Sequence, residues 1–370
     1  MTDAFTVGIE EEYFLVDAGT KLVANDVPPL FFDAAKAAAD GRITTEFLQP
    51  QVEVVTSPHM SMAHARGELR ELRLIASEVA AGHGLAILAA GTHPTAIWRQ
   101  ARQTEAERYD TVMRDLQMIG QRDLLCGTHV HVQLPDADAR IDVMYRMLPY
   151  LPLFIALSTS SPFWQSRRTG LMGYRLAAYD ELPRTGVPEL FRTQAEFDDY
   201  VTALVRSGVI ENSSFIWWAI RPSRAHPTLE LRAPDSCTLL EDTIAIAGLY
   251  RALARHLYFN RRLNADLDAV GRAIAVENKW QAQRNGVHAT FVTRAGAVTV
   301  AEFLDRVIGD MAADAAALGC DAEIDRCRAI VDCGTSADAQ LRVYAAHRDG
   351  GSRDAALRAV TDWIAQATLQ

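Results

Sequence analysis

Polar and apolar residues alternate along the first third of the chain, as they do in strands that bury one face. Such extended segments are expected at residues 6–16, 43–56, 85–93 and 125–134. Between the second and the third, Leu69, Leu72, Ile75 and Val79 recur at the spacing of one helix face, so a helix is expected over residues 62–82. The pattern predicts an α+β fold that begins with strands.

The rest of the chain is expected to be mostly helical, with a short return to extended structure. Helices are predicted at residues 141–158 and 196–207, and extended segments at residues 215–221 and 228–233. After Cys237 the apolar spacing is helical throughout, with clear stretches at residues 241–263, 269–283 and 300–318. No linker, repeat or low-complexity segment divides the chain, which favours one domain over residues 1–370.

A long loop is predicted between the helices, over residues 161–188, and it is rich in Arg, Gly and Pro. Loops longer than ~15 residues in compact domains tend to be functional or disordered. This one carries aromatic and cationic residues, namely Trp164, Arg167, Arg168, Tyr174 and Arg175. It is interpreted either as a flap over a site or as a solvated surface loop.

The first extended segment carries an acidic pair. Glu10 and Glu12 lie on one face of the predicted strand, and Glu11 and Tyr13 on the other. At ~4 Å two carboxylates repel by roughly 4 kcal/mol at an effective dielectric constant of 20, so the pair must be hydrated, partly protonated or bound to a cation. An exposed edge strand would also explain it. Glu11, on the opposite face, is predicted to be dispensable.

Other predicted strands repeat this arrangement of a polar face on an apolar back. Glu53 lies in Gln-Val-Glu-Val-Val, and Glu230 shares a strand face with Arg232. His129 and His131 also project from one face. The two histidines could be purely structural, and a zinc site with three histidines would need a third at a spacing that the sequence does not offer. A carboxylate-rich site favours Mg²⁺ or Mn²⁺ instead.

Arginines gather near the late strands and could contact phosphates that a metal ion bridges. They are Arg221, Arg224, Arg232 and Arg284. The chain has neither the G-x-x-x-x-G-K-[ST] loop nor the G-x-G-x-x-G turn, so a nucleotide would be held through metal and arginine on the sheet itself.

Composition narrows the class of protein. Of the 370 residues, 49% are hydrophobic and 23% are charged, as in ordinary globular proteins. A net charge of −10 argues against a general nucleic-acid binder. The chain shows neither a basic leader followed by an apolar run nor a membrane-length apolar run, and its five cysteines contain no C-x-x-C pair. Reduced thiols and a cytoplasmic location are expected.

Several blocks together resemble the YbdK-type carboxylate-amine ligase family, also called glutamate-cysteine ligase type 2. The blocks, in chain order, are residues 8–13 (GIEEEY), 126–132 (CGTHVHV), 161–164 (SPFW), 228–232 (TLELR) and 277–280 (ENKW). The resemblance extends over about residues 5–290. It divides the predicted single catalytic domain into a sheet-bearing ligase core over residues 1–290 and a helical C-terminal part over residues 291–370.

The resemblance implies a glutamine synthetase-like fold, in which a curved and mainly antiparallel sheet carries helices on its convex face. It implies that ATP and Mg²⁺, or Mn²⁺, bind on the concave face. The implied metal ligands are Glu10, Glu12, Glu46, Glu53, His129 and Glu230. Arg232 and Glu53 are the implied catalytic residues, and the expected nucleotide contacts are Arg221, Arg232, Asn278 and Arg284.

The implied activity is ATP-dependent ligation of a carboxylate, such as that of glutamate, to an amine through an acyl phosphate, with glutamate-cysteine ligase activity as one form. A homo-oligomer, in the form of a dimer, is also implied, with neither a nucleic-acid nor a membrane partner. The residues leave two alternatives open. One is a metal-dependent amidohydrolase built on His129 and His131, and the other is a nucleotide-binding relative without efficient catalysis.

Overall fold

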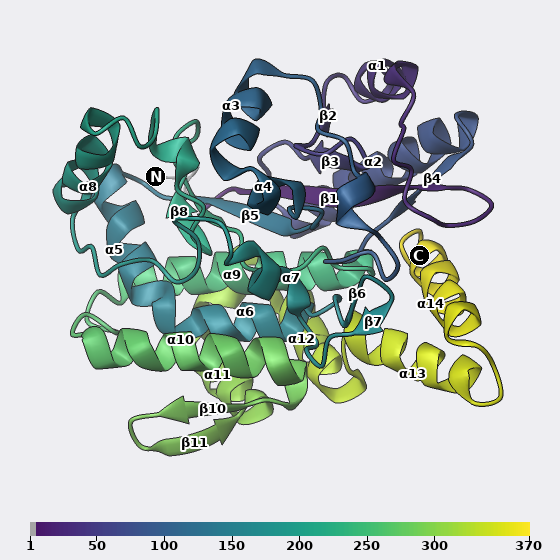
Figure 1. Ribbon diagram of the computed structural model, residues 1–370. Helices are drawn as coiled ribbons and strands as arrows, with labels where there is room; N and C mark the ends of the chain where they lie inside the picture. The colour runs from purple at the N-terminus through teal and green to yellow at the C-terminus, as the bar shows by residue number, and fades with distance from the viewer. Residues whose placement is uncertain (1–4) are drawn as a thin grey trace.

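The centre of the computed structural model, which describes residues 5–370, is an open antiparallel sheet (Figure 1). Seven strands of the described chain join it in the order β2-β3-β1-β5-β9-β8, with β4 also paired to β1. Its strands are β1 Val7–Asp17, β2 Ile43–Thr45, β3 Gln51–Val55, β4 Leu85–Leu88, β5 Thr128–Gln133, β8 Ile220–Pro222 and β9 Thr228–Leu231. Every pairing in this sheet is antiparallel.

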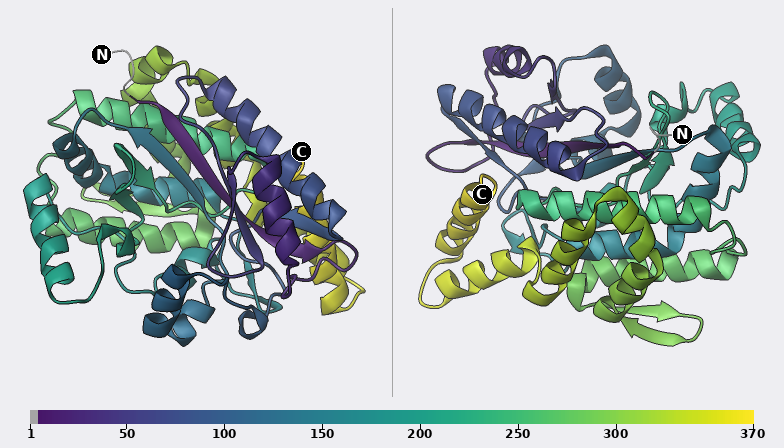
Figure 2. Two further views of the ribbon diagram at one scale, coloured as in Figure 1. Left: turned by 90° about the horizontal axis from the view of Figure 1, so that it is seen from above. Right: turned by 180° about the vertical axis from the view of Figure 1, so that it is seen from behind.

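Helices surround the sheet and make up most of the second half of the chain (Figure 2). The helices of the first half are α1 Pro29–Ala38, α2 Met62–Gly82, α3 Glu107–Leu116, α4 Met118–Gln121, α5 Ala137–Met147, α6 Leu151–Ser158 and α7 Tyr174–Tyr179. Those of the second half are α8 Gln194–Arg206, α9 Leu240–Phe259, α10 Ala269–Asn285, α11 Val300–Leu318, α12 Asp321–Cys333, α13 Ser336–Arg348 and α14 Arg353–Ala367.

The two faces of the sheet have different environments, as the first half of β1 shows. Its apolar residues Val7 and Ile9 are fully buried, on the face that α2 and α9 cover. Glu10 and Glu12 point to the opposite face, which borders a cavity. The acidic pair therefore lies on a central strand between β3 and β5. The interpretation of β1 as a protected edge strand is wrong.

Glu11 is the buried anion of the covered face, with an exposed fraction of 0%. Its carboxylate accepts hydrogen bonds from Arg73 Nε at 2.8 Å and Arg73 Nη2 at 2.6 Å. The hydroxyls of Tyr13 and Thr243 donate to the same carboxylate. These partners come from β1, α2 and α9. The prediction that Glu11 is dispensable is therefore wrong for folding, because removing it would leave a guanidinium buried without a counter-ion.

The same guanidinium ties the C-terminus to the sheet. Arg73 Nη1 donates to the Thr368 carbonyl at 3.0 Å and to the Thr238 carbonyl at 3.0 Å. The Ala89 amide just after β4 donates to Thr368 Oγ1 at 3.0 Å. The last helix, α14, thus ends against β4 (Figure 1). The C-terminal part thus helps to fix the strand that carries Glu10 and Glu12.

Deleting residues 368–370 is expected to lower the free energy of unfolding by at least about 1–3 kcal/mol, because the deletion leaves the buried Ala89 amide without a partner. Chemical denaturation would measure the change. Deleting only Gln370 is the matched control, since the Thr368 carbonyl stays part of a peptide group and keeps its contacts, and stability should stay near the full-length value. Equal stability of both truncated chains and the full chain would contradict the assigned role of Thr368.

Most predicted elements are present, and the differences have local causes. The segment 43–56 divides into β2 and β3 around Pro50. The predicted loop 161–188 contains the hairpin β6 Phe163–Trp164 and β7 Arg167–Arg168, as well as α7. The expectation of helix throughout after Cys237 is wrong at one hairpin, β10 Thr290–Thr293 and β11 Gly296–Thr299. Valine and threonine favour these strands, and Gly296 takes the positive φ of 130° at the turn.

Two further expectations concern the cysteines and the apolar segments. All five cysteines are free, and four of them are buried, which confirms the expectation of thiols without a disulfide framework. One helical stretch of the described chain, Ala137–Ser158, is long and apolar enough for a membrane span, and 89% of its most apolar window is buried inside the protein. That burial is typical of a core helix.

Candidate active site

The register of the sheet brings polar side chains of five strands together on its open face. Glu12 of β1 lies opposite Glu53 of β3. Glu10 lies opposite His129 of β5. His131, also on β5, lies opposite Glu230 of β9, which in turn faces Arg221 of β8. Directly opposed residues in a sheet are close enough for their side chains to interact, so antiparallel pairing alone assembles a continuous band of charged groups.

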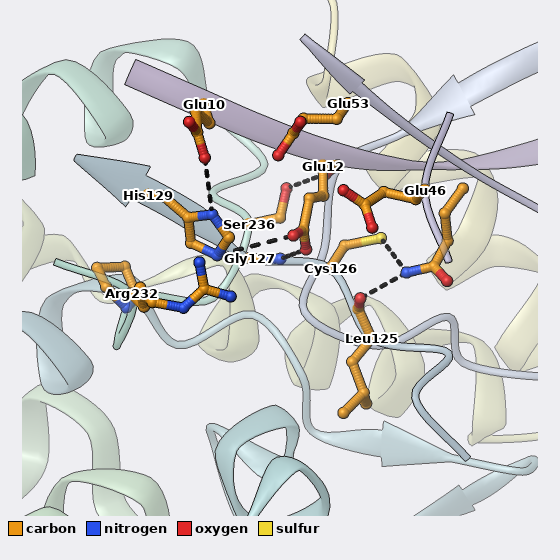
Figure 3. Close-up of polar contacts among 12 residues, drawn as sticks. Glu10, Glu12, Glu46, Glu53, Leu125, Cys126, Gly127, His129, Arg232 and Ser236 are labelled. Carbon is orange, nitrogen blue, oxygen red and sulfur yellow. Dashed lines mark hydrogen bonds and ion pairs between the residues drawn. The ribbon is translucent and has the colours of Figure 1, made fainter. Parts of the chain in front are cut away.

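Short contacts connect this band (Figure 3). Glu10 lies between two histidines, with 3.2 Å from its Oε2 to His129 Nδ1 and 3.1 Å from its Oε1 to His131 Nε2. Glu12 Oε2 accepts a hydrogen bond from the Gly127 amide at 2.5 Å. Its Oε1 lies 3.7 Å from His129 Nε2. His129 therefore stands between the two carboxylates of the acidic strand.

Two overlapping groups of these residues could hold a cation. Glu10, His129 and Glu230 form one, and Glu12, Glu53 and His129 the other, each with ligand atoms within 4.8 Å of one another. His129 Nε2 is also buried without a hydrogen-bond partner in the described chain, as expected for an atom that a ligand completes. Mostly carboxylate oxygens with one imidazole suit Mg²⁺ or Mn²⁺ better than zinc. Glu46 is in neither group.

Burial and mutual repulsion shift the pKa values of these carboxyl groups strongly. Burial, and then the charge of Glu12, raises the pKa of both Glu46 and Asp123 to about 8. Burial and the carboxylates of Glu10, Glu46 and Glu12 hold the pKa of Glu53 well above its usual range. So many acids cannot all ionise together without a cation among them. The electrostatics and the two candidate ligand groups thus point to the same requirement.

Glu230 organises the two arginines of the band. Arg221 donates to Glu230 through Nε at 2.7 Å and Nη2 at 3.1 Å, and its Nη1 donates to the carbonyls of Ser214 and Ile216. Its donors are thus used within the protein, which favours a role in holding Glu230 rather than a nucleotide. Arg232 pairs with the same carboxylate, and its Nε has no partner among the described residues. Arg232 is therefore the better candidate for a phosphate contact.

A cavity of about 470 Å³ opens over the acidic end of the band. Helix α3 and the segment 174–182 form its far walls. The predicted flap thus contributes Arg175 and Tyr179, whereas its Arg167 and Arg168 are exposed on β7. Asp123, which no sequence pattern indicates, also lines this cavity. A single polar residue just before an apolar run gives little signal of such a position.

Two of the expected nucleotide contacts lie apart from this cavity. Asn278 on α10 uses its side-chain amide to bind the backbone of Val292, donating at 2.8 Å and accepting at 2.7 Å. It fastens the β10–β11 hairpin to α10. Arg284 is exposed on the same helix. Neither residue lines the cavities beside the band, because α10 packs on α6, away from the open face of the sheet.

A second, less polar cavity of about 260 Å³ lies at the other end of the band. Glu10 lines both cavities. Besides His131, its walls include Val55, Pro58, Pro227 and the methyl-bearing Thr6, Thr56 and Thr228. The carboxylate and histidine band therefore separates a charged chamber from a largely apolar one.

Comparison with solved structures identifies the fold. The chain superposes with a TM-score of 0.74 on a bifunctional glutathione synthetase from Pasteurella multocida, at 15% identity, over 99% of this chain and 53% of that one. It superposes with a TM-score of 0.71 on glutamate–cysteine ligase from Francisella tularensis in complex with AMP, at 15% identity, over 99% and 89% of the two chains. The architecture is that of glutamine synthetase-like ligases, as predicted.

Comparison with sequences then gives the family. The model of glutamate-cysteine ligase family 2 matches residues 6–358. A protein of Bradyrhizobium sp. (strain ORS 278), named "Putative glutamate--cysteine ligase 2", is 57% identical over 99% of this chain and 88% of its own length. A relative of the same name from Rhodospirillum rubrum is 44% identical over 99% and 96%. The chain therefore belongs to glutamate-cysteine ligase family 2.

Membership in this family makes the protein an enzyme that forms carbon–nitrogen bonds. The family confirms the resemblance drawn from residues 8–13 and 126–132. It also decides against the amidohydrolase alternative, in agreement with the open sheet that places His129 and His131 among carboxylates.

Proposed function

We propose that the enzyme uses ATP and a divalent cation to activate a substrate carboxylate as an acyl phosphate, which an amine then converts to an amide. The observation that carries this proposal is the band of Glu10, Glu12, Glu53, His129 and Glu230 between two cavities of different character. A reaction of this kind must bring a nucleotide and a carboxylate together at one set of metal-bridged phosphates. The band offers such a place with room on both sides.

One cavity suits the nucleotide, and the other suits the carboxylate substrate. The largely apolar chamber around Val55, Pro58 and Pro227 would take the adenine ring, because a flat base gains most from apolar walls. The triphosphate would then reach over Glu10 toward the charged chamber. The carboxylate substrate would enter that chamber, where Arg232 and Arg175 lie. Glu10 lines both cavities, so the phosphate and the carboxylate would meet beside it.

The cation is proposed to be Mg²⁺, or Mn²⁺, and the residues that would hold it are Glu10, Glu12, Glu53, His129 and Glu230, with Glu46 beside them. When bound, such ions neutralise phosphate charge and orient the reacting groups. Glu10 and Glu230 stay ionised in the folded protein, since burial, which raises their pKa, is outweighed by hydrogen bonds and charges of the neighbouring histidines and arginines. They are thus ready to bind a cation.

In the proposed first step a carboxylate oxygen attacks the γ-phosphorus, forming the acyl phosphate as ADP leaves. In the second step an amine attacks the carbonyl carbon, phosphate departs, and the nitrogen loses a proton. Arg232, fixed by Glu230 and by its 3.3 Å hydrogen bond to Tyr179 Oη, would stabilise charge on the transferring phosphoryl group. Glu53 would act with it by holding the cation opposite Glu12.

The proposed substrates are a glutamate-like carboxylate and an amine, cysteine being one candidate. We also propose that the enzyme is a homodimer located in the cytoplasm. The mechanism does not require a dimer.

Hydroxylamine trapping tests the proposal without knowledge of the natural amine. Incubation with ATP, Mg²⁺, hydroxylamine and a panel of carboxylates should yield a hydroxamate, because hydroxylamine intercepts an acyl phosphate. Replacing Glu10 by Gln should reduce both hydroxamate yield and metal-dependent ATP binding by on the order of 10- to 100-fold, since it removes one ligand charge. Chelation of the metal should do the same.

Glu71→Gln is the matched control, because Glu71 is an exposed glutamate on α2 and its replacement should leave both readouts unchanged. ATP binding without hydroxamate formation from any carboxylate would favour a nucleotide-binding relative without efficient catalysis. Unchanged ATP binding in Glu10→Gln would show that the band is not the metal site.

A further inference from the structure

The short helix α7 holds Arg232 at two points. Arg175 Nη1 donates to the backbone carbonyl of Arg232 at 3.2 Å. Tyr179 Oη accepts a hydrogen bond from Arg232 Nη2 at 3.3 Å. All three residues line the charged chamber. The orientation of the guanidinium that is proposed to stabilise the transferring phosphoryl group therefore depends on where α7 lies.

Helix α7 cannot keep this position by itself. It has six residues, and isolated helices shorter than ~12–15 residues are marginal in water. Its N-cap residue, Gly173, has no side chain that could cap the helix. The position of α7 must therefore come from contacts with other elements, and the helix that packs on it is α10.

Helix α10 anchors both ends of α7. Before the N-terminal end, the amides of Met172 and Gly173 donate to the Gln283 carbonyl at 2.8 Å and 2.9 Å. At the C-terminal end, Lys279 Nζ forms an ion pair with Asp180, the C-cap residue of α7. Lys279 and Gln283 lie one turn apart on the same face of α10. One face of α10 thus fixes the place of α7 in the wall of the chamber.

Lys279 is the buried one of the three lysines of the chain, with an exposed fraction of 7%. Lysine is almost never buried unless it is paired, and Asp180 is its only ion-pair partner within residues 5–370. A second pair nearby, Arg122 with Glu181, is more exposed, and exposed pairs contribute little. The pair of Lys279 and Asp180 is therefore the main ionic anchor at the C-terminal end of α7.

We infer that Lys279 is a positioning residue of the ligase reaction, which acts through Asp180 and α7 to hold Tyr179 against Arg232. This inference rests on the proposed function, which gives Arg232 its role at the phosphoryl group. Lys279 lines neither cavity beside the band, so its effect on turnover must pass through α7. A small shift of α7 is sufficient, because misplacing a catalytic group by about 1 Å can cost on the order of 10²-fold in rate.

The first test is kinetic and uses the full chain with ATP, Mg²⁺, hydroxylamine and the carboxylate that gives most hydroxamate. Lys279→Met should lower kcat on the order of 10- to 100-fold, while KM for ATP should change less than about threefold, since Arg232 acts in the transition state. Lys279→Arg keeps a cation for Asp180 and should recover most of the turnover. Lys36→Met, at an exposed lysine of α1, is the matched control and should retain wild-type kinetics. An unchanged kcat in Lys279→Met would overturn the inference.

A double-mutant cycle shows whether Lys279 acts through Tyr179. Tyr179→Phe removes the hydroxyl that accepts the hydrogen bond from Arg232 and keeps the ring. Adding Lys279→Met to Tyr179→Phe should lower kcat much less than Lys279→Met does alone, because the contact that Lys279 holds in place is already lost. Two losses that simply multiply in the double variant would mean that Lys279 acts by another route, and the inference would be wrong.

Hydrogen exchange measures the anchoring of α7 without any substrate. In Lys279→Met, exchange of the amides of residues 174–180 should become on the order of 10-fold faster, because α7 opens more often, and exchange of β1 should not change. Asp180→Asn breaks the pair at its more exposed partner and should give the same result, so it keeps the test valid if Lys279→Met does not fold.

The two measurements separate failure of this inference from failure of the proposed function. Unchanged exchange of residues 174–180 in both variants, or faster exchange throughout the protein, would overturn the inference. Faster exchange confined to α7, in a protein whose wild type forms no hydroxamate from any carboxylate, would confirm the anchoring by Lys279. It would overturn the proposed function and, with it, the part of α7 in ligation.

Discussion

Replacing Glu11 by alanine is expected to lower the free energy of unfolding by about 3–5 kcal/mol, because it leaves the buried Arg73 guanidinium without its carboxylate. Arg73 is 2% exposed and cannot turn to solvent without moving α2. Its remaining acceptors are the carbonyls of Thr238, Cys237 and Thr368, which do not balance the charge. Urea denaturation followed by circular dichroism would measure the loss.

A double replacement of Glu11 and Arg73 by apolar residues should cost less than the sum of the two single replacements, because it removes both charges together. Glu78→Ala is the control, because it removes a glutamate from α2, the helix that carries Arg73. If Glu11→Ala unfolds at the same urea concentration as the wild type, the buried pair does not stabilise the fold. Ligase activity in the folded fraction should persist, since Glu11 lies on the face away from the cavities.

Replacing Arg232 by alanine is expected to lower turnover on the order of 10³-fold, because a guanidinium that stabilises a transferring phosphoryl group contributes at least this much in comparable enzymes. Arg232 also neutralises Glu230, so part of the loss would come from a disturbed ligand. Initial rates of ADP release, at saturating ATP and carboxylate, would show the effect on kcat rather than on KM.

Arg232→Lys separates these two contributions. It keeps a charge beside Glu230 but cannot contact Tyr179 and a phosphate at once as the planar group does, so metal-dependent ATP binding should recover more than turnover. Arg168→Ala, at an exposed arginine of β7, is the control and should retain wild-type rates. A turnover within tenfold of wild type in Arg232→Ala would remove Arg232 from the proposed catalytic step.

The sequence is sufficient to predict the strands and helices whose periodicity is regular. Helix α2 begins and ends at the predicted residues, Met62 and Gly82, and α11 also matches its expected range. The β10–β11 hairpin was missed because two strands of four residues each are too short for alternation to be distinguished from a helix end. The hairpin depends on Asn278, which binds Val292 from a separate helix.

The candidate site was predictable where residues share a strand face. Period-two alternation places Glu10 with Glu12 and His129 with His131 whatever the rest of the fold does. Which carboxylate faces which histidine depends on strand register, and register is set by pairing between segments far apart in the chain. Asp123 and Arg175 lie outside the sheet, on a loop and on α7, so no periodicity indicates that they line one chamber.

By itself, then, the sequence determined that an acidic strand, an H-x-H strand and an E-x-R strand expose polar faces, and its resemblance to a ligase family placed a metal site on them. The tertiary structure decided the partners. It paired Glu11 with Arg73 in the core, bound Arg221 to Glu230, and moved Asn278 and Arg284 away from the site. The reason is physical, since local geometry fixes the direction of a side chain, while its neighbours depend on packing between distant segments.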